Sequence, residues 1–356
     1  MGPKNLNLIL LIALIVVIAT PIAPMPASGQ SNNTDQTSNR QSGSAEQFNV
    51  PMFTVTPLAD GGEPQVFTFT GGLIRSGLVT GLAFEGDASG LTGNFDAAFD
   101  TCMIVESPDG TTVSFGGAAV EVPGFPECGT ANAIPWDFLE GQSGNDGFYQ
   151  SLQLDAFAGG VDIEGTWTIS FVHGWPSFAA SPITWGNVAI TLLGPGQFKL
   201  PRFTLTSLIS GGTAKLFSFP HSISEPVTGL SFEGDVSGVT GNPTRAADTC
   251  LIVEAPDGTT VAFGGLFSDL PGFPLCNLNN SASSPWDFLG VISGTDGFYQ
   301  SLHPSVFAAG VETDGPWKFT LVNAWNSTSS RPITWENVII SLIGDRLFSD
   351  RFVSDR

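Results

Sequence analysis

The residues of this chain that could do chemistry are mainly carboxylates, and they occur at matching places in the two halves of the sequence. Asp100, Asp137 and Asp146 in the first half correspond to Asp248, Asp287 and Asp296 in the second, and the pairs Glu85/Glu233 and Asp87/Asp235 add further acidic positions. Two carboxyl groups about 5 to 10 Å apart across a sugar-binding cleft can hydrolyse a glycoside. A carboxylate hydrolase is therefore one reading of this pattern.

The same carboxylates are candidate ligands for calcium, which prefers several oxygen atoms from Asp, Glu and loop carbonyls. Such loops occur at PWDF, GNDG and GTDG, so the candidate ligands are Asp100, Asp137, Asp146, Asp248, Asp287 and Asp296. The alternative is that these are turn residues whose carboxylates bond to nearby backbone. The loop carboxylates make calcium a candidate cofactor, although no EF-hand loop or Asp-x-Asp-x-Asp run is present. No other cofactor is expected.

The histidines argue against a duplicated nucleophilic site. The chain has three, His173, His221 and His303. At the matching positions the other half has Asn323, no histidine, and Gln153. A Ser-His-Asp triad needs the imidazole as its base, so we expect no catalytic residue and predict that the chain is not an enzyme.

Tryptophans in loops supply candidate ligand-binding residues. They follow an expected strand in HGWPSFAASP and NAWNSTSSRP, or lie in PWDF: Trp136, Trp175, Trp286 and Trp325. A loop tryptophan can stack on a sugar ring or anchor a partner protein. The alternative is that each caps the end of the β structure, because large aromatic side chains are usually mostly buried.

Four cysteines indicate one disulfide in each half. Cys102 and Cys128 are 26 residues apart, and Cys250 and Cys276 repeat this interval 148 residues later. Repeated paired spacing in an exported chain is typical of disulfides. Four buried thiols are the alternative, and the absence of Cys-x-x-Cys argues against zinc.

The elements that position these residues are short strands in a duplicated all-β fold. Long segments recur, as in VTGLAFEGDASGLTGN and VTGLSFEGDVSGVTGN, and no stretch after the first 29 residues sustains a helical period. Trp167, Ile169 and Phe171 alternate with polar residues, as in a strand with one buried face. We predict two tandem jelly-roll or β-sandwich domains, each with one disulfide.

Composition sets the expected domain boundaries. We predict a signal peptide at residues 1–29, because an apolar run of 12 residues follows Lys4 and precedes small residues. A polar, disordered linker is expected at 30–50, the first repeat at 51–196, the second at 200–345 and a tail at 346–356. The apolar run is too short to span a membrane.

The ordered motifs of each half resemble those of the P domain (P/Homo B), a β jelly roll that follows the catalytic domain of proprotein convertases and many bacterial subtilisin-like proteases. The similar stretches run from about 79 to 194 and from about 227 to 344, and include IVESPDGTTVSF, DGFYQSLQLDAFAGG and GTWTISFV. The resemblance implies a galactose-binding-like jelly roll. His173 and Asn323 stand where that family usually has an acidic residue.

The charge balance and the resemblance together indicate a binding protein. Asp and Glu total 33 against 12 Lys and Arg, a net charge of −21, which disfavours nucleic acid and anionic membrane surfaces. We predict a secreted, extracellular or periplasmic protein of bacterial type that presents its repeats to a protein, glycan or surface polymer. The alternatives are domains that stabilise or target a separate subtilisin-like protease and, less favoured, a carboxylate hydrolase.

Overall fold

The computed structural model describes residues 45–344 except for 73–76, 94–96, 118–121, 123, 130–132, 137, 141–143, 175–179, 222–225, 267–269, 282, 289–293, 308 and 312–313. The predicted signal peptide, most of the predicted linker and the predicted tail at 346–356 lie outside the described residues. Asp137 and Trp175 do so as well. Within the described ranges, no helix is long and apolar enough to cross a membrane.

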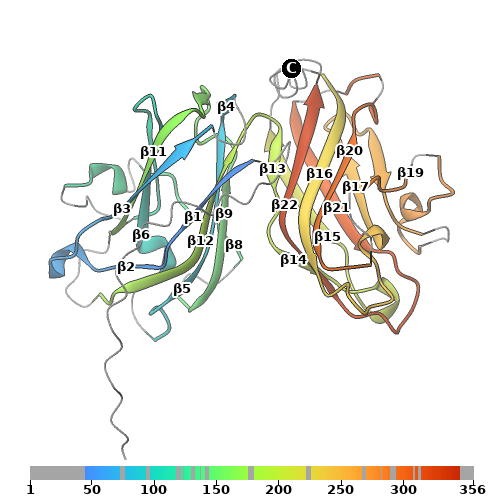
Figure 1. The fold of residues 1–356 in the computed structure, drawn as a ribbon, viewed down its shortest axis with the longest axis horizontal. Coiled ribbons are helices and arrows are strands. Elements are labelled where there is room, and N and C mark those ends of the chain that lie inside the picture. Colours follow the sequence, from blue (N-terminus) through green and yellow to red (C-terminus); the bar gives the residue numbers. More distant parts are fainter. Residues whose placement is uncertain are drawn as a thin grey trace, which may run out of the picture. The chain divides into compact units, whose positions relative to one another are not determined.

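The first half folds into two main antiparallel sheets that enclose one core (Figure 1). One sheet has the order β1-β12-β5-β9-β8, with β2 beside β12. Its strands are β1 (Glu46–Val50), β2 (Phe53–Val55), β5 (Gly81–Ser89), β8 (Phe138–Glu140), β9 (Gly147–Gln153) and β12 (Ile183–Leu193). The other has the order β3-β11-β6-β7, formed by β3 (Gln65–Gly71), β6 (Thr101–Glu106), β7 (Thr112–Phe115) and β11 (Gly165–His173).

Short elements complete the first half. A separate pair joins β4 (Leu78–Val79) to β10 (Val161–Asp162). Three 3-10 turns lie between strands: η1 (Leu58–Asp60), η2 (Ala98–Asp100) and η3 (Pro126–Cys128). η2 leads directly into β6, and η3 carries the second cysteine of the disulfide.

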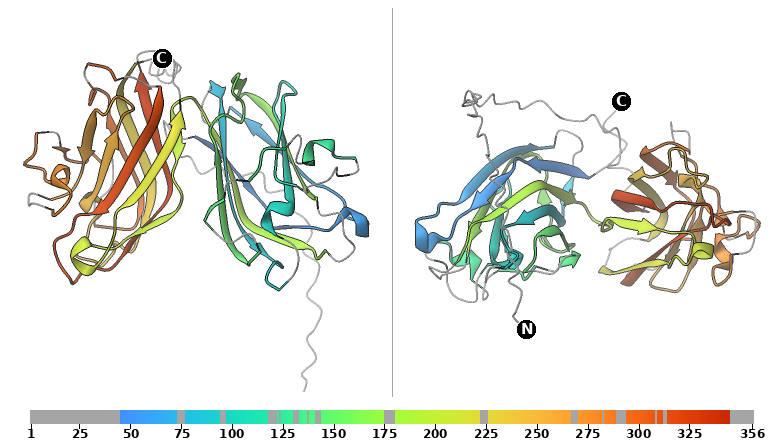
Figure 2. Two further views of the ribbon diagram at one scale, coloured as in Figure 1. Left: turned by 180° about the vertical axis from the view of Figure 1, so that it is seen from behind. Right: turned by 90° about the horizontal axis from the view of Figure 1, so that it is seen from below.

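The second half repeats this arrangement with two sheets of its own (Figure 2). One has the order β13-β22-β16-β20 with β14 beside β22, from β13 (Gln197–Lys199), β14 (Phe203–Leu205), β16 (Val227–Ser237), β20 (Gly297–His303) and β22 (Ile333–Gly344). The other has the order β15-β21-β17-β18-β19, from β15 (Lys215–His221), β17 (Thr249–Glu254), β18 (Thr260–Phe263), β19 (Ser283–Ser284) and β21 (Gly315–Asn323). The 3-10 turns are η4 (Leu208–Ser210), η5 (Ala246–Asp248) and η6 (Pro274–Cys276).

The alternation of apolar and polar residues along the strands explains how the two cores are filled. Trp167, Ile169 and Phe171 of β11 are fully buried, whereas the intervening Thr168 and Ser170 are half-buried. The matching face of β21 buries Trp317, Phe319 and Leu321 in the second core. Because successive side chains of a strand point to opposite faces, this alternation fills the space between the two sheets.

The prediction of an all-β chain with two jelly-roll or β-sandwich repeats is confirmed, and the described residues include no α-helix. Both disulfides form as predicted, Cys102–Cys128 and Cys250–Cys276. Each joins the second residue of a central strand to a 3-10 turn on the outer side of its sheet. Disulfides persist outside the reducing cytoplasm, which indicates a non-cytoplasmic location.

The start of the first repeat differs from the sequence expectation. The predicted linker runs to residue 50, but Glu46–Val50 forms β1 and pairs with Val188–Leu192 of β12. The physical reason is that Phe48 and Val50 alternate with polar residues and enter the first core. Likewise β13, at 197–199, pairs with β22 although it lies between the two predicted domain ranges.

Candidate ligand-binding surface

Asp146 and Asp296 are two candidate calcium ligands, and each joins two loops of its own repeat by hydrogen bonds. Asp146 Oδ1 accepts the backbone N–H groups of Leu91 at 2.7 Å and Thr92 at 3.0 Å, while the Asp146 N–H donates to Thr92 Oγ1 at 2.9 Å. Asp296 makes the same three bonds to residues 239 and 240. The pKa of Asp146 lies below its usual range because these N–H groups, first that of Thr92, stabilise the ionised form.

Asp100 and Asp248 are buried at the ends of η2 and η5. Asp100 Oδ2 accepts the Ala97 N–H at 2.7 Å, and Asp248 Oδ2 accepts the Arg245 N–H at 2.7 Å. Asp248 is 5% exposed, and this burial raises its pKa to about 6 against the opposing effect of the Arg245 N–H bond. The position is therefore a structural cap close to the first residue of a central strand.

Three further carboxylates, those of Glu85, Asp87 and Asp235, have partners within the fold, whereas Asp287 is exposed. Lys199 is 1% exposed, and its Nζ lies 3.1 Å from Glu85 Oε2 and donates to Thr191 Oγ1 at 3.1 Å. Asp87 Oδ2 accepts Asn187 Nδ2 at 2.8 Å, and Asp235 accepts Asn337 in the same way. Among the described residues, no group of three or more His, Cys, Asp or Glu side chains is placed to hold a metal ion.

Trp136 and Trp286, two candidate ligand-binding residues, are half-buried and engaged by other side chains. Trp136 Nε1 donates to the Thr101 carbonyl at 2.8 Å, and its ring stacks on Phe138 at 5.2 Å with an interplanar angle of 14°. Trp286 repeats both contacts, to the Thr249 carbonyl and to Phe288. Rings also contact these indoles from the core: Phe84, Phe115, Phe232 and Phe263.

Thr101 and Thr249 anchor two tryptophans each, a role that the sequence did not suggest. Thr101 accepts Trp136 at its carbonyl and Trp185 Nε1 at its hydroxyl, the latter at 3.0 Å. Thr249 does the same with Trp286 and Trp335. Because the threonine precedes a disulfide cysteine, this anchor ties the PWDF loop to the central strand.

Trp325 lies in the loop after β21 and is half-buried. Its backbone is fixed at both ends, since its N–H donates to Asn323 Oδ1 at 3.0 Å and its carbonyl accepts Ser207 Oγ at 2.6 Å. Its partner position, Trp175, lies outside the described residues. The three tryptophans that the structure describes, Trp136, Trp286 and Trp325, are all half-buried.

A polar cluster in the second repeat was also missed from the sequence. Ser301 Oγ lies 2.9 Å from His303 Nε2 and accepts the Asp287 N–H at 3.2 Å. The His303 ring lies against that of Phe263, with centroids 4.3 Å apart and planes tilted by 37°, and burial lowers the pKa of His303 against the opposing effect of the nearby Asp287. Ser301 is fully buried, so its hydroxyl is inaccessible to a substrate and serves as a structural link.

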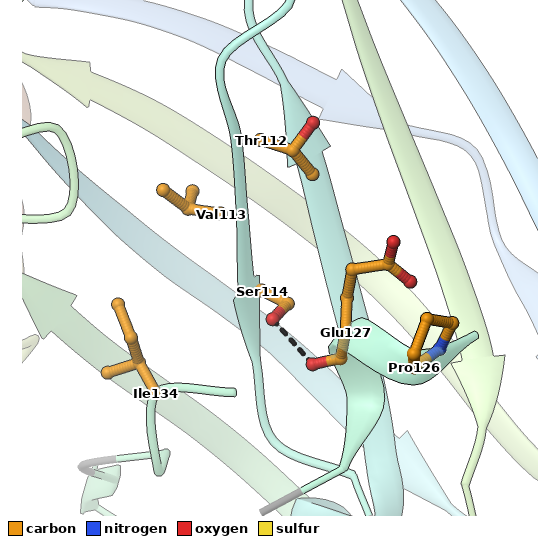
Figure 3. A pocket seen from close by; sticks show the side chains of 6 residues that line it. All are labelled: Thr112, Val113, Ser114, Pro126, Glu127 and Ile134. Carbon is orange, nitrogen blue, oxygen red and sulfur yellow. Dashed lines mark hydrogen bonds between the residues drawn. The ribbon is translucent and has the colours of Figure 1, made fainter. Parts of the chain in front are cut away.

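The first repeat has a pocket of about 390 Å³ between η3 and the outer strand β7. Its lining combines apolar side chains with hydroxyl groups and one carboxylate: Thr112, Val113, Ser114, Pro126, Glu127 and Ile134. Ser114 Oγ donates to the Glu127 carbonyl at 2.7 Å, the bond drawn in Figure 3. The Cys102–Cys128 disulfide ties η3 to β6, the strand that pairs with β7, so one wall of the pocket is covalently linked to the sheet that forms the other.

The matching place in the second repeat has a different lining. Glu127, Ser114 and Ile134 correspond to Leu275, Ala262 and Ser284. A hydroxyl still donates to the carbonyl of the 3-10 turn, but it is Ser283, which bonds to Leu275 and corresponds to Ala133. An alignment of the two halves shows these four substitutions, which are the sequence signal that could have located the pocket.

The comparisons with known proteins give no family. No family model matches the chain, and no curated protein matches it. Solved structures that align with it include a serine protease of Aeromonas sobria at 12% identity, with 43% of this chain covered and a TM-score of 0.23. The chain spans 28% of the length of that protease.

Two viral proteins align over more of the chain. A triple jelly-roll and turret protein of an archaeal virus matches at 12% identity and a TM-score of 0.21, covering 85% of this chain and 60% of that one. The subviral particle protein VP2 of infectious bursal disease virus matches at 11% identity and a TM-score of 0.23, covering 88% and 76%. None of these scores supports a conclusion about family or activity.

Proposed function

We propose that this chain is an exported, non-catalytic binding protein whose two P-domain-like repeats present loops and strand edges to a partner protein, glycan or surface polymer. The observation that carries the proposal is the pocket between η3 and β7, which is lined by apolar, hydroxyl and carboxylate groups and lies beside the disulfide that ties η3 to β6. Binding sites combine apolar walls with a few placed polar groups, and this pocket has both.

The placement of the carboxylates supports a role without catalysis. Asp146 and Asp100 accept backbone N–H groups, Asp87 accepts an asparagine amide, and Glu85 pairs with Lys199. A general acid or nucleophile has to reach a substrate atom, whereas these groups are directed at the protein's own backbone and side chains. The fully buried Ser301 gives no accessible nucleophile beside His303.

The order of the sequence motifs supports the P-domain resemblance and the second candidate function, in which the repeats stabilise or target a separate subtilisin-like protease. In that case the ligand of the pocket belongs to the protease. Calcium stays a prediction, and its effect on binding is measured directly by adding a chelator.

The test uses the purified chain from residue 30 onward on arrays of polysaccharides and of peptides, with calcium and with chelator. The same glycans and peptides are offered as substrates in solution. We expect saturable binding and no product. Binding should weaken in Glu127→Lys, which alters the pocket, and persist in Glu164→Lys, which makes the same charge change at an exposed site in the same repeat. Turnover by the purified chain, or binding that is the same in both variants, would overturn the proposal.

A further inference from the structure

We propose that the pocket between η3 and β7 binds an extended peptide that adds to the outer edge of β7 and places a Lys or Arg side chain against Glu127. This inference rests on the proposed binding function and names the partner class of the same site. It follows from the strand edge, from the charge at the pocket and from the contrast with the second repeat.

The outer edge of β7 is also an edge of its sheet. β7 pairs with β6 on one side and is the last strand in the order β3-β11-β6-β7. On its other side, Ile134 makes one isolated parallel bridge to Phe115. In that bridge the Ile134 N–H donates to the Ser114 carbonyl at 2.8 Å, and the Gly116 N–H donates to the Ile134 carbonyl at 2.9 Å.

Strand geometry fixes which backbone groups of β7 face this edge. The N–H and C=O of one residue point to the same edge, and the direction alternates along the strand. Since the Ser114 carbonyl faces outward, the Ser114 N–H and both backbone groups of Thr112 face outward as well. None of these three groups bonds to another backbone group among the described residues. They lie along the pocket that Thr112 and Ser114 line, and such groups are the template for an added strand.

An added strand would meet the side chains that line the pocket. Val113 and Ile134 give the pocket apolar contacts, and the exposed Glu127 supplies a negative charge beside the edge (Figure 3). The net charge of the chain is −21, which attracts a basic segment and repels an acidic one. An extended peptide with a Lys or Arg therefore suits the site better than a neutral glycan or an acidic polymer.

The second repeat shows what a filled edge looks like. There β19 pairs in parallel with β18 over both Ala262 and Phe263, one residue further than Ile134 reaches along β7. The carboxylate is absent, because Leu275 replaces Glu127. A short strand of the protein itself thus occupies the place that we assign to a peptide in the first repeat.

The test measures binding of labelled peptides of about six residues, the usual length of a strand, to the purified chain by fluorescence anisotropy. One peptide alternates Val and Thr around a central Lys. A second has Glu in place of Lys, and a third is the Lys peptide with alternate backbone amides methylated, which removes the donors that pair with an edge. The protein variants are Glu127→Gln and the matched control Glu164→Gln, both at exposed positions.

We expect the Lys peptide to bind about ten-fold more tightly than its methylated form, because the main-chain hydrogen bonds are lost. Glu127→Gln should weaken the Lys peptide about three- to five-fold, the size of an exposed ion pair, and more salt should reduce that difference. Glu164→Gln should leave the affinity unchanged.

Equal binding of the Lys and Glu peptides, or of the methylated and unmethylated ones, would overturn the inference. A chain that binds polysaccharides on the array and no peptide would also overturn it while leaving the proposed binding function in place. If the chain binds nothing and turns a substrate over, the proposed function itself fails.

Discussion

The outer edge of β7 in the first repeat and that of β18 in the second lie beside matching disulfides and matching 3-10 turns. The two edges differ in the segment that pairs with them and in the serine that bonds to the turn. In both, a serine hydroxyl donates to the carbonyl of the residue before the cysteine of the turn. The donor is Ser114 on the strand in the first repeat and Ser283 on the neighbouring segment in the second. The position that matches Ser283 is Ala133 in the first repeat, and the position that matches Ser114 is Ala262 in the second.

The two repeats show that the fold requires a hydroxyl donor for the turn carbonyl, whereas the segment that carries the donor can vary. The turn carbonyl accepts a serine hydroxyl in both repeats, and a polar group without a hydrogen bond is costly wherever water does not reach it. Either neighbouring segment can supply the donor. Where the segment supplies it, as with Ser283, that segment also forms β19 and covers the strand edge. Where the strand supplies it, as with Ser114, the only pairing at the edge among the described residues is the bridge at Ile134, and a pocket lies beside it.

The largest expected effect comes from removing a disulfide. Replacing Cys102 and Cys128 by Ala should lower the free energy of unfolding of the first repeat by about 3 to 4 kcal/mol, since the bond closes a loop of 26 residues. Replacing Cys250 and Cys276 should cost the second repeat a similar amount. Urea unfolding measures both. Only the first change should also abolish binding at the pocket. If the second change abolished it equally, the pocket would not be the binding site.

Next in size is a change that should affect both repeats equally. Gly116 and Gly264 have φ angles of 72° and 75°, and an added Cβ would lie 2.0 Å from Trp136 Nε1 or 2.1 Å from Trp286 Nε1. Each Gly→Ala change should therefore destabilise its repeat by about 3 kcal/mol through strain and overpacking. Thermal unfolding checks this. A large effect in one repeat alone would show that the threonine–tryptophan anchors are not equivalent.

A pH-dependent difference should distinguish Asp248→Asn from the parent protein. Burial raises the pKa of Asp248 to about 6, so the folded state binds a proton that the unfolded state releases near pH 4. The parent should therefore lose up to about 3 kcal/mol of stability as the pH rises from about 4 to about 6, and the variant should not. His303 has a lowered pKa and acts in the opposite direction, but it is present in both proteins. Parallel stability profiles across this range would contradict the assignment.

The smallest effect tests the exchange of donors itself. Ser114→Ala should cost about 1 kcal/mol, the net value of one hydrogen bond, and adding Ala133→Ser should restore most of it by supplying the donor used in the second repeat. A double-mutant cycle in urea measures the coupling. If the two changes were simply additive, the two serines would not be interchangeable.

Much of the fold could be predicted from the sequence because the signals were local or repeated. The period of two at Trp167, Ile169 and Phe171 identifies a strand, and the 26-residue interval repeated after 148 residues identifies the disulfides. β1 was missed because Phe48 and Val50 are only two apolar residues next to a long polar segment, and their pairing partner, β12, lies about 140 residues away in the sequence.

The candidate site was harder to predict than the fold. Several of the described carboxylates and tryptophans singled out by type bond within the protein, as Asp146 does with Leu91 and Thr92, whereas Asp287 is exposed. Residue type alone does not show whether a carboxylate faces solvent, a ligand or a backbone amide. The pocket depends on Ser114, Glu127 and Ile134, three ordinary residues whose combination matters only once β7 is known to be an edge strand.

The measurement that tests the central claim most directly is amide hydrogen exchange, resolved by NMR, at Ser114 and its counterpart Ala262. The register of β18 with β19 uses the Ala262 N–H, whereas the Ser114 N–H faces the pocket. We predict that the Ser114 amide exchanges at least about ten-fold faster than that of Ala262, and that the Lys peptide slows Ser114 and leaves Ala262 unchanged. Equal protection of the two amides in the unbound protein, or a peptide effect at Ala262 instead, would contradict the account.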